Sequence, residues 1–169
     1  MSITTTAHLN FRGSARQALE FYQSAFGGHL MIATYSQTGV PQDDPDGGPA
    51  SFAPLSKGSP DADRVSFGVV TGASGFRVAA YDIFGASGDA LAGTSASGAR
   101  RAAGLTHDEP LFLMVNGDSA EEIAEPFEAL SQGGTVIAPL PAQDEAAAPY
   151  SMLTDRFGVT WIFGVTPRH

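Results

Sequence analysis

Histidines are the residues of this chain best suited to metal binding and acid–base chemistry, since the sequence contains no cysteine. The four histidines are His8, His29, His107 and His169. None of them belongs to an HxH or HExxH pattern, so the sequence carries no local zinc motif. His107 is followed by Asp108 and Glu109, and these side chains could donate ligands from the edge of a loop. A solvated loop is the simpler interpretation of this tripeptide.

Asp155 is the best-placed lone carboxylate, within the run Asp155-Arg156-Phe157-Gly158. A general base is one interpretation, but an aspartate that opens a tight turn closed by a glycine is the stronger one. The only tryptophan, Trp161, follows in an apolar run and is predicted to lie in the core. The sequence has no G-x-S-x-G nucleophile elbow and no glycine-rich phosphate loop. We therefore expect no cofactor, and no catalytic residue can be named.

Charge and hydropathy exclude two kinds of partner. The 169 residues carry a formal net charge of -9 and a pI near 4.6, which disfavours nucleic acid because phosphate binding requires clustered lysine and arginine. No apolar run approaches the ~20 residues of a membrane-spanning helix, so we expect no membrane partner. The N-terminus shows no secretory signal, and the absence of cysteine permits a reducing compartment. A cytoplasmic location is the expectation.

Two segments of the chain repeat one order of elements. The first begins with a strand over 5–11 and continues into a helix that Ser14 and Gln17 are predicted to cap as a capping box. Gly27-Gly28 ends this helix, and a second strand follows over 29–35. The residues that form the buried face of the helix are Ala15, Ala18, Leu19, Tyr22 and Phe26.

The second segment has a strand over 112–115 and a helix that Ser119 and Glu122 are predicted to cap. Its buried face carries Ile123, Phe127 and Leu130, and Pro126 interrupts the pattern without removing the helix prediction. Gly133-Gly134 ends the helix. The remaining predicted strands cover 64–70 and 75–81 in the first segment, and 135–139, 150–154 and 159–165 in the second.

Each segment therefore reads as a βαβββ module. We predict a single α+β domain over 1–169, with module one at about 3–83, a linker at 84–108 and module two at 109–166. Two long stretches, Ser36 to Asp63 and Ile83 to Asp108, are predicted to be irregular. They exceed the ~12–15 residues of ordinary loops, which favours lids, dimer arms or linkers.

Three motifs carry a family resemblance. LNFRGSARQALEFYQSAFGG over 9–28, EALSQGG over 128–134 and MLTDRFGVTW over 152–161 resemble the PhnB-like branch of the vicinal oxygen chelate superfamily, which includes glyoxalases, bleomycin resistance proteins and dioxygenases. The resemblance implies two curved mixed sheets around a central cleft, commonly in a homodimer. In metalloenzymes of this superfamily, four side chains from the strands hold a divalent metal.

The metal ligands of the family do not carry over to this chain. The corresponding positions fall on Ala7, Val78, Pro110 or a neighbour, and Ile162, and these side chains cannot bind a metal. His8 adjoins Ala7 but is turned to the other face by strand alternation. The resemblance thus implies a cleft without an ion. The residues predicted to line it are Ala7, Leu9, Phe67, Val78, Ala80, Phe112, Met114 and Ile162.

The leading functional hypothesis is a metal-free, PhnB-like binding protein for a small, partly apolar molecule. The acidic charge suits a cationic ligand, by analogy with drug-sequestering members of the superfamily. The alternative is a metal-dependent lyase, isomerase or dioxygenase with displaced ligands, such as His107 with Glu109 or Asp82. A third hypothesis, a purely structural or interaction domain, is favoured if the cleft is filled by its own side chains.

Overall fold

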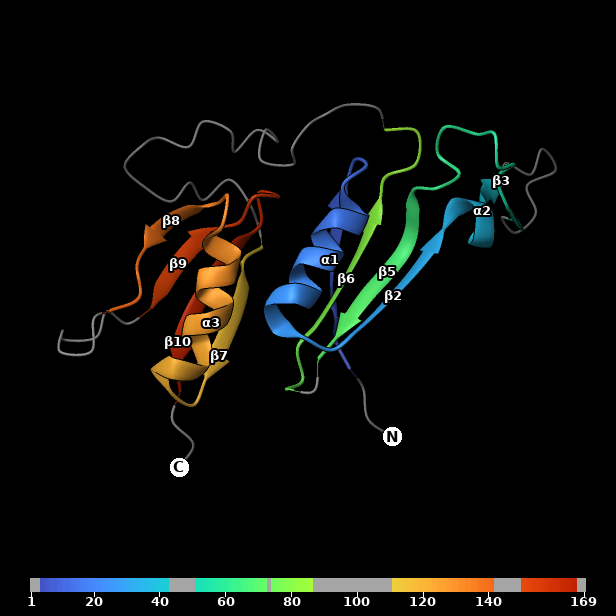
Figure 1. Cartoon of the computed structure of the whole chain (residues 1–169). Helices are drawn as coiled ribbons and strands as arrows, with labels where there is room; N and C mark the ends of the chain where they lie inside the picture. Colours follow the sequence, from blue (N-terminus) through green and yellow to red (C-terminus); the bar gives the residue numbers. More distant parts are fainter. Residues whose placement is uncertain (1–3, 43–50, 73, 87–110, 142–149, 167–169) are drawn as a thin grey trace. The chain divides into compact units, whose positions relative to one another are not determined.

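The computed structural model describes residues 4–42, 51–72, 74–86, 111–141 and 150–166. The chain divides into two compact units, Met1–Asp89 and Ala90–His169. Each unit contains one four-stranded mixed sheet and one long helix on a face of that sheet (Figure 1). The predicted α+β fold with two βαβββ modules is thereby confirmed, and the central cleft stays a prediction. Among the described residues, no helix is long and apolar enough to cross a membrane.

The sheet of unit one has the strand order β1-β6-β5-β2. β1 runs parallel to β6, and the other neighbours are antiparallel. The elements are β1 (Ala7–Phe11), α1 (Ala15–Phe26), β2 (His29–Thr34), β5 (Val65–Thr71) and β6 (Arg77–Asp82). The predicted strands are confirmed with ends shifted by one or two residues, because caps and alternation mark these boundaries from both sides.

Helix α1 packs closely on this sheet. Its buried residues are Ala15, Ala18, Leu19 and Tyr22, as the sequence predicted. Phe26 is half-buried and stacks on Phe76 with ring centroids 4.0 Å apart. A Cβ added at Gly68 of β5 would lie 2.3 Å from Leu19 Cδ1, so only glycine allows this approach of helix and strand. The face of the sheet that contains Gly68 is therefore the packed face.

The start of α1 differs from the prediction. Ser14 makes no side-chain capping hydrogen bond, so the predicted capping box with Gln17 is wrong. The carboxylate of Asp82, at the end of β6, accepts hydrogen bonds from the backbone N–H groups of Gly13 and Ala15 instead. A long-range contact has thus replaced the local cap that the sequence suggested.

The first long stretch contains regular structure that was not predicted. α2 (Tyr35–Thr38) follows β2 directly, and a hairpin joins β3 (Val40–Gln42) to β4 (Ser51–Ala53). Gln37 Oε1 accepts a 2.9 Å hydrogen bond from the backbone N–H of Thr34, which closes the helical turn. Residues 43–50 of that stretch, and residues 87–108 of the second one, lie outside the described residues.

The sheet of unit two repeats the arrangement, with the order β7-β10-β9-β8 and β7 parallel to β10. Its elements are β7 (Leu113–Gly117), α3 (Ala120–Ser131), β8 (Thr135–Ala138), β9 (Ser151–Thr154) and β10 (Thr160–Val165). Ser119 Oγ accepts from the N–H of Glu122, which confirms the predicted cap. Phe127 of α3 packs edge-on against Phe163 of β10, with centroids 5.2 Å apart. The helix contains Pro126 and is assigned without a break.

Candidate functional site

The face of the unit-one sheet opposite α1, which we call the open face, is the candidate binding surface. On β1, Leu9 and Phe11 turn toward α1 and are 8% and 1% exposed, whereas His8 and Asn10 turn away and are exposed. Strand registers extend this division over the sheet, since side chains paired across strands lie on the same face. The open face thus carries the polar residues of β1.

Three rings form a cluster on the open face. The imidazole of His8 lies 5.8 Å from the ring of Phe67 at an interplanar angle of 77°, and 5.1 Å from the ring of Tyr81 at 58°. These edge-to-face and tilted arrangements are those that aromatic pairs prefer. We call His8, Phe67 and Tyr81 the ring cluster. It joins β1, β5 and β6, and Phe67 remains 38% exposed.

The floor beside the ring cluster is apolar. Met31, Val69, Ala79 and His8 form one row across all four strands, in register from β2 to β1. Met31 is 52% exposed, whereas Val69 and Ala79 are buried. A row with small, buried residues in the middle and large side chains at its ends can support a flat apolar group.

The predicted pocket residues of unit one do not share this face. Ala7 pairs with Val78, and Leu9 pairs with Ala80. These four side chains alternate with His8 and Ala79, so they lie on the packed face toward α1, and only Phe67 lies on the open face. The sequence carried a signal for this division, because polar His8 and Asn10 alternate with apolar Leu9 and Phe11 along β1.

The predicted residues of unit two do share a face. Met114 pairs with Ile162, and both alternate with residues on the α3 side, where Phe163 packs. A Cβ added at Gly164 would lie 3.4 Å from Met114 Cε and 3.0 Å from Asn116 Oδ1, which places these side chains together. Phe112, half-buried just before β7, belongs to the same side by alternation. That the eight residues line one ligand pocket stays a prediction.

The strands do not supply a metal-binding set. Asp82 is the only carboxylate on any strand of the structure's described part. It is 2% exposed, and its oxygens accept hydrogen bonds from the N–H groups of Gly13, Ala15 and Val65. Within the described ranges, no group of three or more His, Cys, Asp or Glu side chains could hold a metal ion.

Of the alternative ligand set, the structure describes one residue only. That residue is Asp82, whose carboxylate lies on the packed face and accepts hydrogen bonds from the N–H groups of Gly13 and Ala15 at the start of α1. The other two candidates, His107 and Glu109, lie outside the described residues, as do Pro110 and His169.

Asp155 opens a turn, as predicted. Its Oδ1 accepts hydrogen bonds from the N–H groups of Phe157 and Val159, at 2.8 and 3.0 Å. Its Oδ2 accepts a 2.9 Å hydrogen bond from the indole Nε1 of Trp161. Gly158 has φ of 86°, the left-handed value that the turn requires. Asp155 is 3% exposed, and both of its carboxylate oxygens accept hydrogen bonds. Trp161 is 1% exposed and lies in the core.

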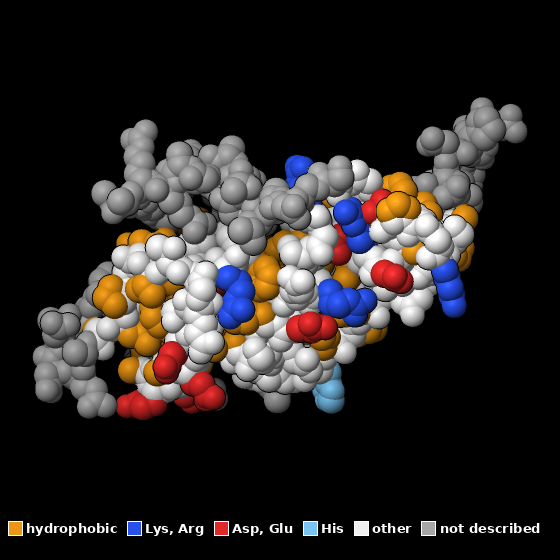
Figure 2. All heavy atoms as spheres, turned by 45° about the horizontal axis from the view of Figure 1, so that its top comes forward, with side chains coloured by type: hydrophobic (Ala, Val, Ile, Leu, Met, Phe, Trp, Pro, Cys, Tyr) orange, Lys and Arg blue, Asp and Glu red, His pale blue; other side chains and the backbone are white. Residues whose placement is uncertain are grey.

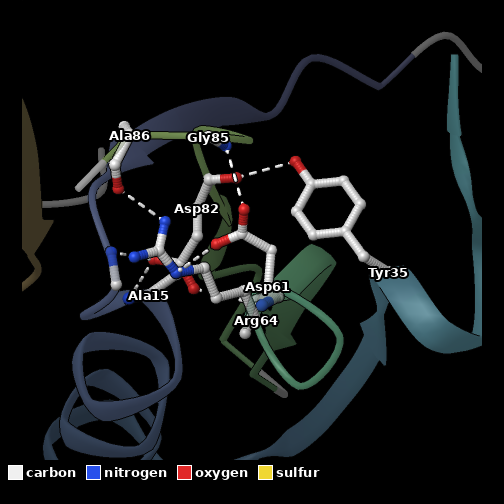
Figure 3. A network of polar contacts seen from close by, with 9 residues as sticks. Ala15, Tyr35, Asp61, Arg64, Asp82, Gly85 and Ala86 are labelled. Atoms are coloured by element: carbon white, nitrogen blue, oxygen red, sulfur yellow. Dashed lines mark hydrogen bonds and ion pairs between the residues drawn. The ribbon is translucent and has the colours of Figure 1, made fainter. Parts of the chain in front are cut away.

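A polar network surrounds the end of β6 (Figure 3). Arg64 Nε pairs with Asp61 Oδ1 at 2.9 Å, and Arg64 Nη1 donates to the carbonyl oxygen of Ala86. Tyr35 donates its hydroxyl to the carbonyl oxygen of Asp82 at 2.7 Å. Burial raises the pKa of Tyr35, and Tyr81 and Asp82 raise this pKa further. These contacts hold the backbone at the end of β6 and just after it, because Tyr35 and Arg64 donate to the carbonyl groups of Asp82 and Ala86.

Charge on the surface is mixed. Figure 2 shows acidic and basic side chains interspersed over the face that it views, with hydrophobic side chains between them. The net charge of -9 therefore does not describe every part of the surface, and the charged residues of each face must be considered separately.

Comparisons with known proteins give a fold. No protein-family model matches the sequence, and no curated protein matches it. The structure is similar to protein PA1353 from Pseudomonas aeruginosa, with a TM-score of 0.63 and 24% identity over 99% of this chain and 100% of that one. It is also similar to a putative 3-demethylubiquinone-9 3-methyltransferase, a PhnB protein from Bacillus cereus, with a TM-score of 0.54 and 20% identity over 97% of this chain and 100% of that one. The chain therefore has the two-module fold that its sequence resemblance to PhnB-like proteins implied.

Proposed function

We propose that this protein binds a small, partly apolar organic molecule on the open face of unit one, without a metal ion. The observation that carries the proposal is the ring cluster of His8, Phe67 and Tyr81 on a sheet face that α1 does not cover. Aromatic side chains beside a few polar groups are the usual composition of a small-molecule site. In line with the resemblance, we propose that the protein acts as a cytoplasmic homodimer.

The chemistry of the site favours binding over turnover. The two carboxylates best placed by sequence or strand position, Asp82 and Asp155, are each occupied by three hydrogen bonds. Of the strand residues on the open face, His8 and His29 are the side chains that commonly serve as general bases. Neither has a carboxylate on a strand beside it, since Asp82 faces α1. The strand residues of the open face therefore offer a ligand rings, amides and hydroxyls, but no histidine–carboxylate pair for acid–base catalysis.

Trp161 is a poor reporter of this site, because it is buried in unit two and hydrogen-bonded to Asp155. The test is a titration of the ¹⁵N-labelled protein with a panel of ring-bearing fragments, followed by two-dimensional NMR. We expect saturable shifts at His8, Phe67 and Tyr81, and none along the exposed side of α1. Shifts spread evenly over the molecule, or confined to unit two, would contradict the proposal.

Phe67→Ala is the matching variant. Truncating an exposed ring leaves the fold intact but removes stacking, so we expect fragment affinity to fall by about three- to tenfold. Phe84→Ala is the control, because Phe84 is equally large and 48% exposed but lies beyond β6, where it contacts Tyr35. Equal effects of the two variants would show that the ring cluster is not the binding surface.

Metal independence has its own experiment. The purified protein is incubated with Zn(II), Ni(II), Mn(II) and Fe(II), desalted and analysed for metal content. We expect far less than one ion per chain, since the described strands contain one carboxylate, Asp82, and it faces α1. About one tightly held ion per chain would overturn the metal-free part of the proposal.

A further inference from the structure

One end of the open face carries basic and hydroxyl side chains side by side. His29 of β2 pairs with Thr71 of β5, and Thr71 pairs with Arg77 of β6. All three are exposed. They lie on the open face because they are two positions along their strands from Met31, Val69 and Ala79. We call His29, Thr71 and Arg77 the basic row.

No acidic residue opposes this row from the same sheet. Strands β1, β2, β5 and β6 contain one carboxylate, Asp82, which faces α1 and caps that helix. Arg77 forms no ion pair with any residue that the structure describes. The strand residues of the open face therefore carry no negative charge, although the whole chain has a net charge of -9. Local charge governs the contacts of a bound ligand more strongly than distant charge does, because salt screens the latter.

The basic row and the ring cluster are spaced along the strands. Phe67 precedes Thr71 by four residues on β5, and Tyr81 follows Arg77 by four residues on β6. At ~3.3 Å per residue, the two sets are about 13 Å apart at the backbone. His8 pairs with Ala79, so its backbone lies midway, about 7 Å along the strands from the other two rings and about 7 Å from the basic row. Between the basic row and the rings of Phe67 and Tyr81, the surface of the sheet is formed by Val69 and Ala79, whose side chains are apolar and small.

We propose that the ligand of this face is an organic anion: a carboxylate-bearing molecule whose ring or apolar body lies on the ring cluster. The guanidinium of Arg77 and the hydroxyl of Thr71 hold the carboxylate, and His29 lies at the far end of the row. Arginine suits this role because its planar fork of donors matches a carboxylate. The inference rests on the proposed function, and it replaces the cationic ligand that the overall acidity suggested.

The experiment uses three probes that differ in their head group alone: phenylhexanoate, phenylhexanol and phenylhexylamine. Each is titrated into the full-length ¹⁵N-labelled protein, and affinity is taken from the shifts of the open-face residues. We expect the carboxylate to bind most tightly, the alcohol more weakly and the amine most weakly. Raising the salt concentration should weaken the carboxylate alone.

Two variants locate the head group. Arg77→Gln should weaken phenylhexanoate by about tenfold or more and leave phenylhexanol unchanged, because a charged hydrogen bond is lost from one probe only. The control is Arg16→Gln, which removes one positive charge from the exposed side of α1. It should leave both affinities unchanged. Thermal midpoints of the two variants should match that of the wild type, since both side chains are exposed.

The outcomes separate the two proposals. If phenylhexylamine binds more tightly than phenylhexanoate, or if both variants act alike, the anionic ligand is refuted while binding on the open face stands. If none of the three probes shifts the open-face residues, both the inference and the proposed function are overturned.

Discussion

The backbone N–H of Ala15, the first residue of α1, donates a 3.0 Å hydrogen bond to Asp82 Oδ1 at the end of β6. The residues are 67 positions apart in sequence. Asp82 Oδ1 also accepts from Gly13, and Oδ2 accepts from Val65 at 3.1 Å. One buried carboxylate thus joins the start of the helix, the end of β6 and the start of β5. Its negative charge also lies where the helix dipole favours it.

Asp82→Ala should therefore destabilise the protein strongly. Three backbone N–H groups lose their acceptor, and two of the three bonds are buried. We expect a loss of about 3 kcal/mol or more in the free energy of unfolding, measured by urea denaturation. Asp63→Ala is the control, because Asp63 lies in the same unit and is exposed. A loss below about 1 kcal/mol for Asp82→Ala would show that water replaces the carboxylate.

Gly68→Ala tests which face of the sheet is packed. The added Cβ would lie 2.3 Å from Leu19 Cδ1, so helix and strand must separate or Leu19 must change its rotamer. We expect a destabilisation of about 1–3 kcal/mol. Gly58→Ala is the matched control, because nothing lies within 4 Å of a Cβ at Gly58. Equal stability of the two variants would mean that α1 does not cover this face.

The sequence predicted the elements better than it predicted the faces. Helix stripes such as Ala15, Ala18 and Leu19 specify both the element and its buried side, because a helix of this kind has one apolar side. A strand such as Arg77–Asp82 is apolar on both sides of its middle, at Val78, Ala79 and Ala80, so alternation alone does not say which residues face the helix. The pairing of β6 with β1 shows which residues face the helix, and this pairing joins segments that are far apart in the sequence.

Short elements and long-range caps were also beyond the sequence. The hairpin of β3 and β4 has three residues per strand, too few for an alternation pattern. Ser14 and Gln17 formed a plausible capping box, but the carboxylate of Asp82 competes for the same N–H groups. A charged acceptor forms the stronger hydrogen bond, and nothing near Ser14 in the sequence announces it.

Tyr35 should give the stability a pH dependence at alkaline pH. Burial, followed by Tyr81 and Asp82, raises the pKa of the Tyr35 hydroxyl above its usual value of about 10. A raised folded-state pKa means that the unfolded chain loses this proton first. The stabilisation from the neutral hydroxyl is therefore complete below about pH 10 and is lost as the pH rises through the folded-state pKa.

Tyr35→Phe provides the measurement. At neutral pH the variant should be less stable by about 1 kcal/mol, because the carbonyl oxygen of Asp82 loses its 2.7 Å hydrogen bond. Above about pH 10 the difference from the wild type should narrow, since only the wild type loses stability through this group. Tyr150→Phe, at an exposed tyrosine, is the control. A difference that stays constant from neutral to alkaline pH would refute the pKa assignment.

Asp155→Asn should disturb unit two through a donor–donor conflict. Oδ1 of Asp155 holds the turn through Phe157 and Val159, so the new amide NH₂ must take the place of Oδ2, opposite the indole N–H of Trp161. Both groups are donors, and both are buried. We expect a destabilisation of about 1–3 kcal/mol and a changed near-ultraviolet circular dichroism signal from Trp161. Glu128→Gln, an exposed carboxylate on α3, should change neither. If the Trp161 signal of Asp155→Asn equals that of the wild type, the indole does not depend on this carboxylate. The turn alone would then explain why an aspartate stands at this position.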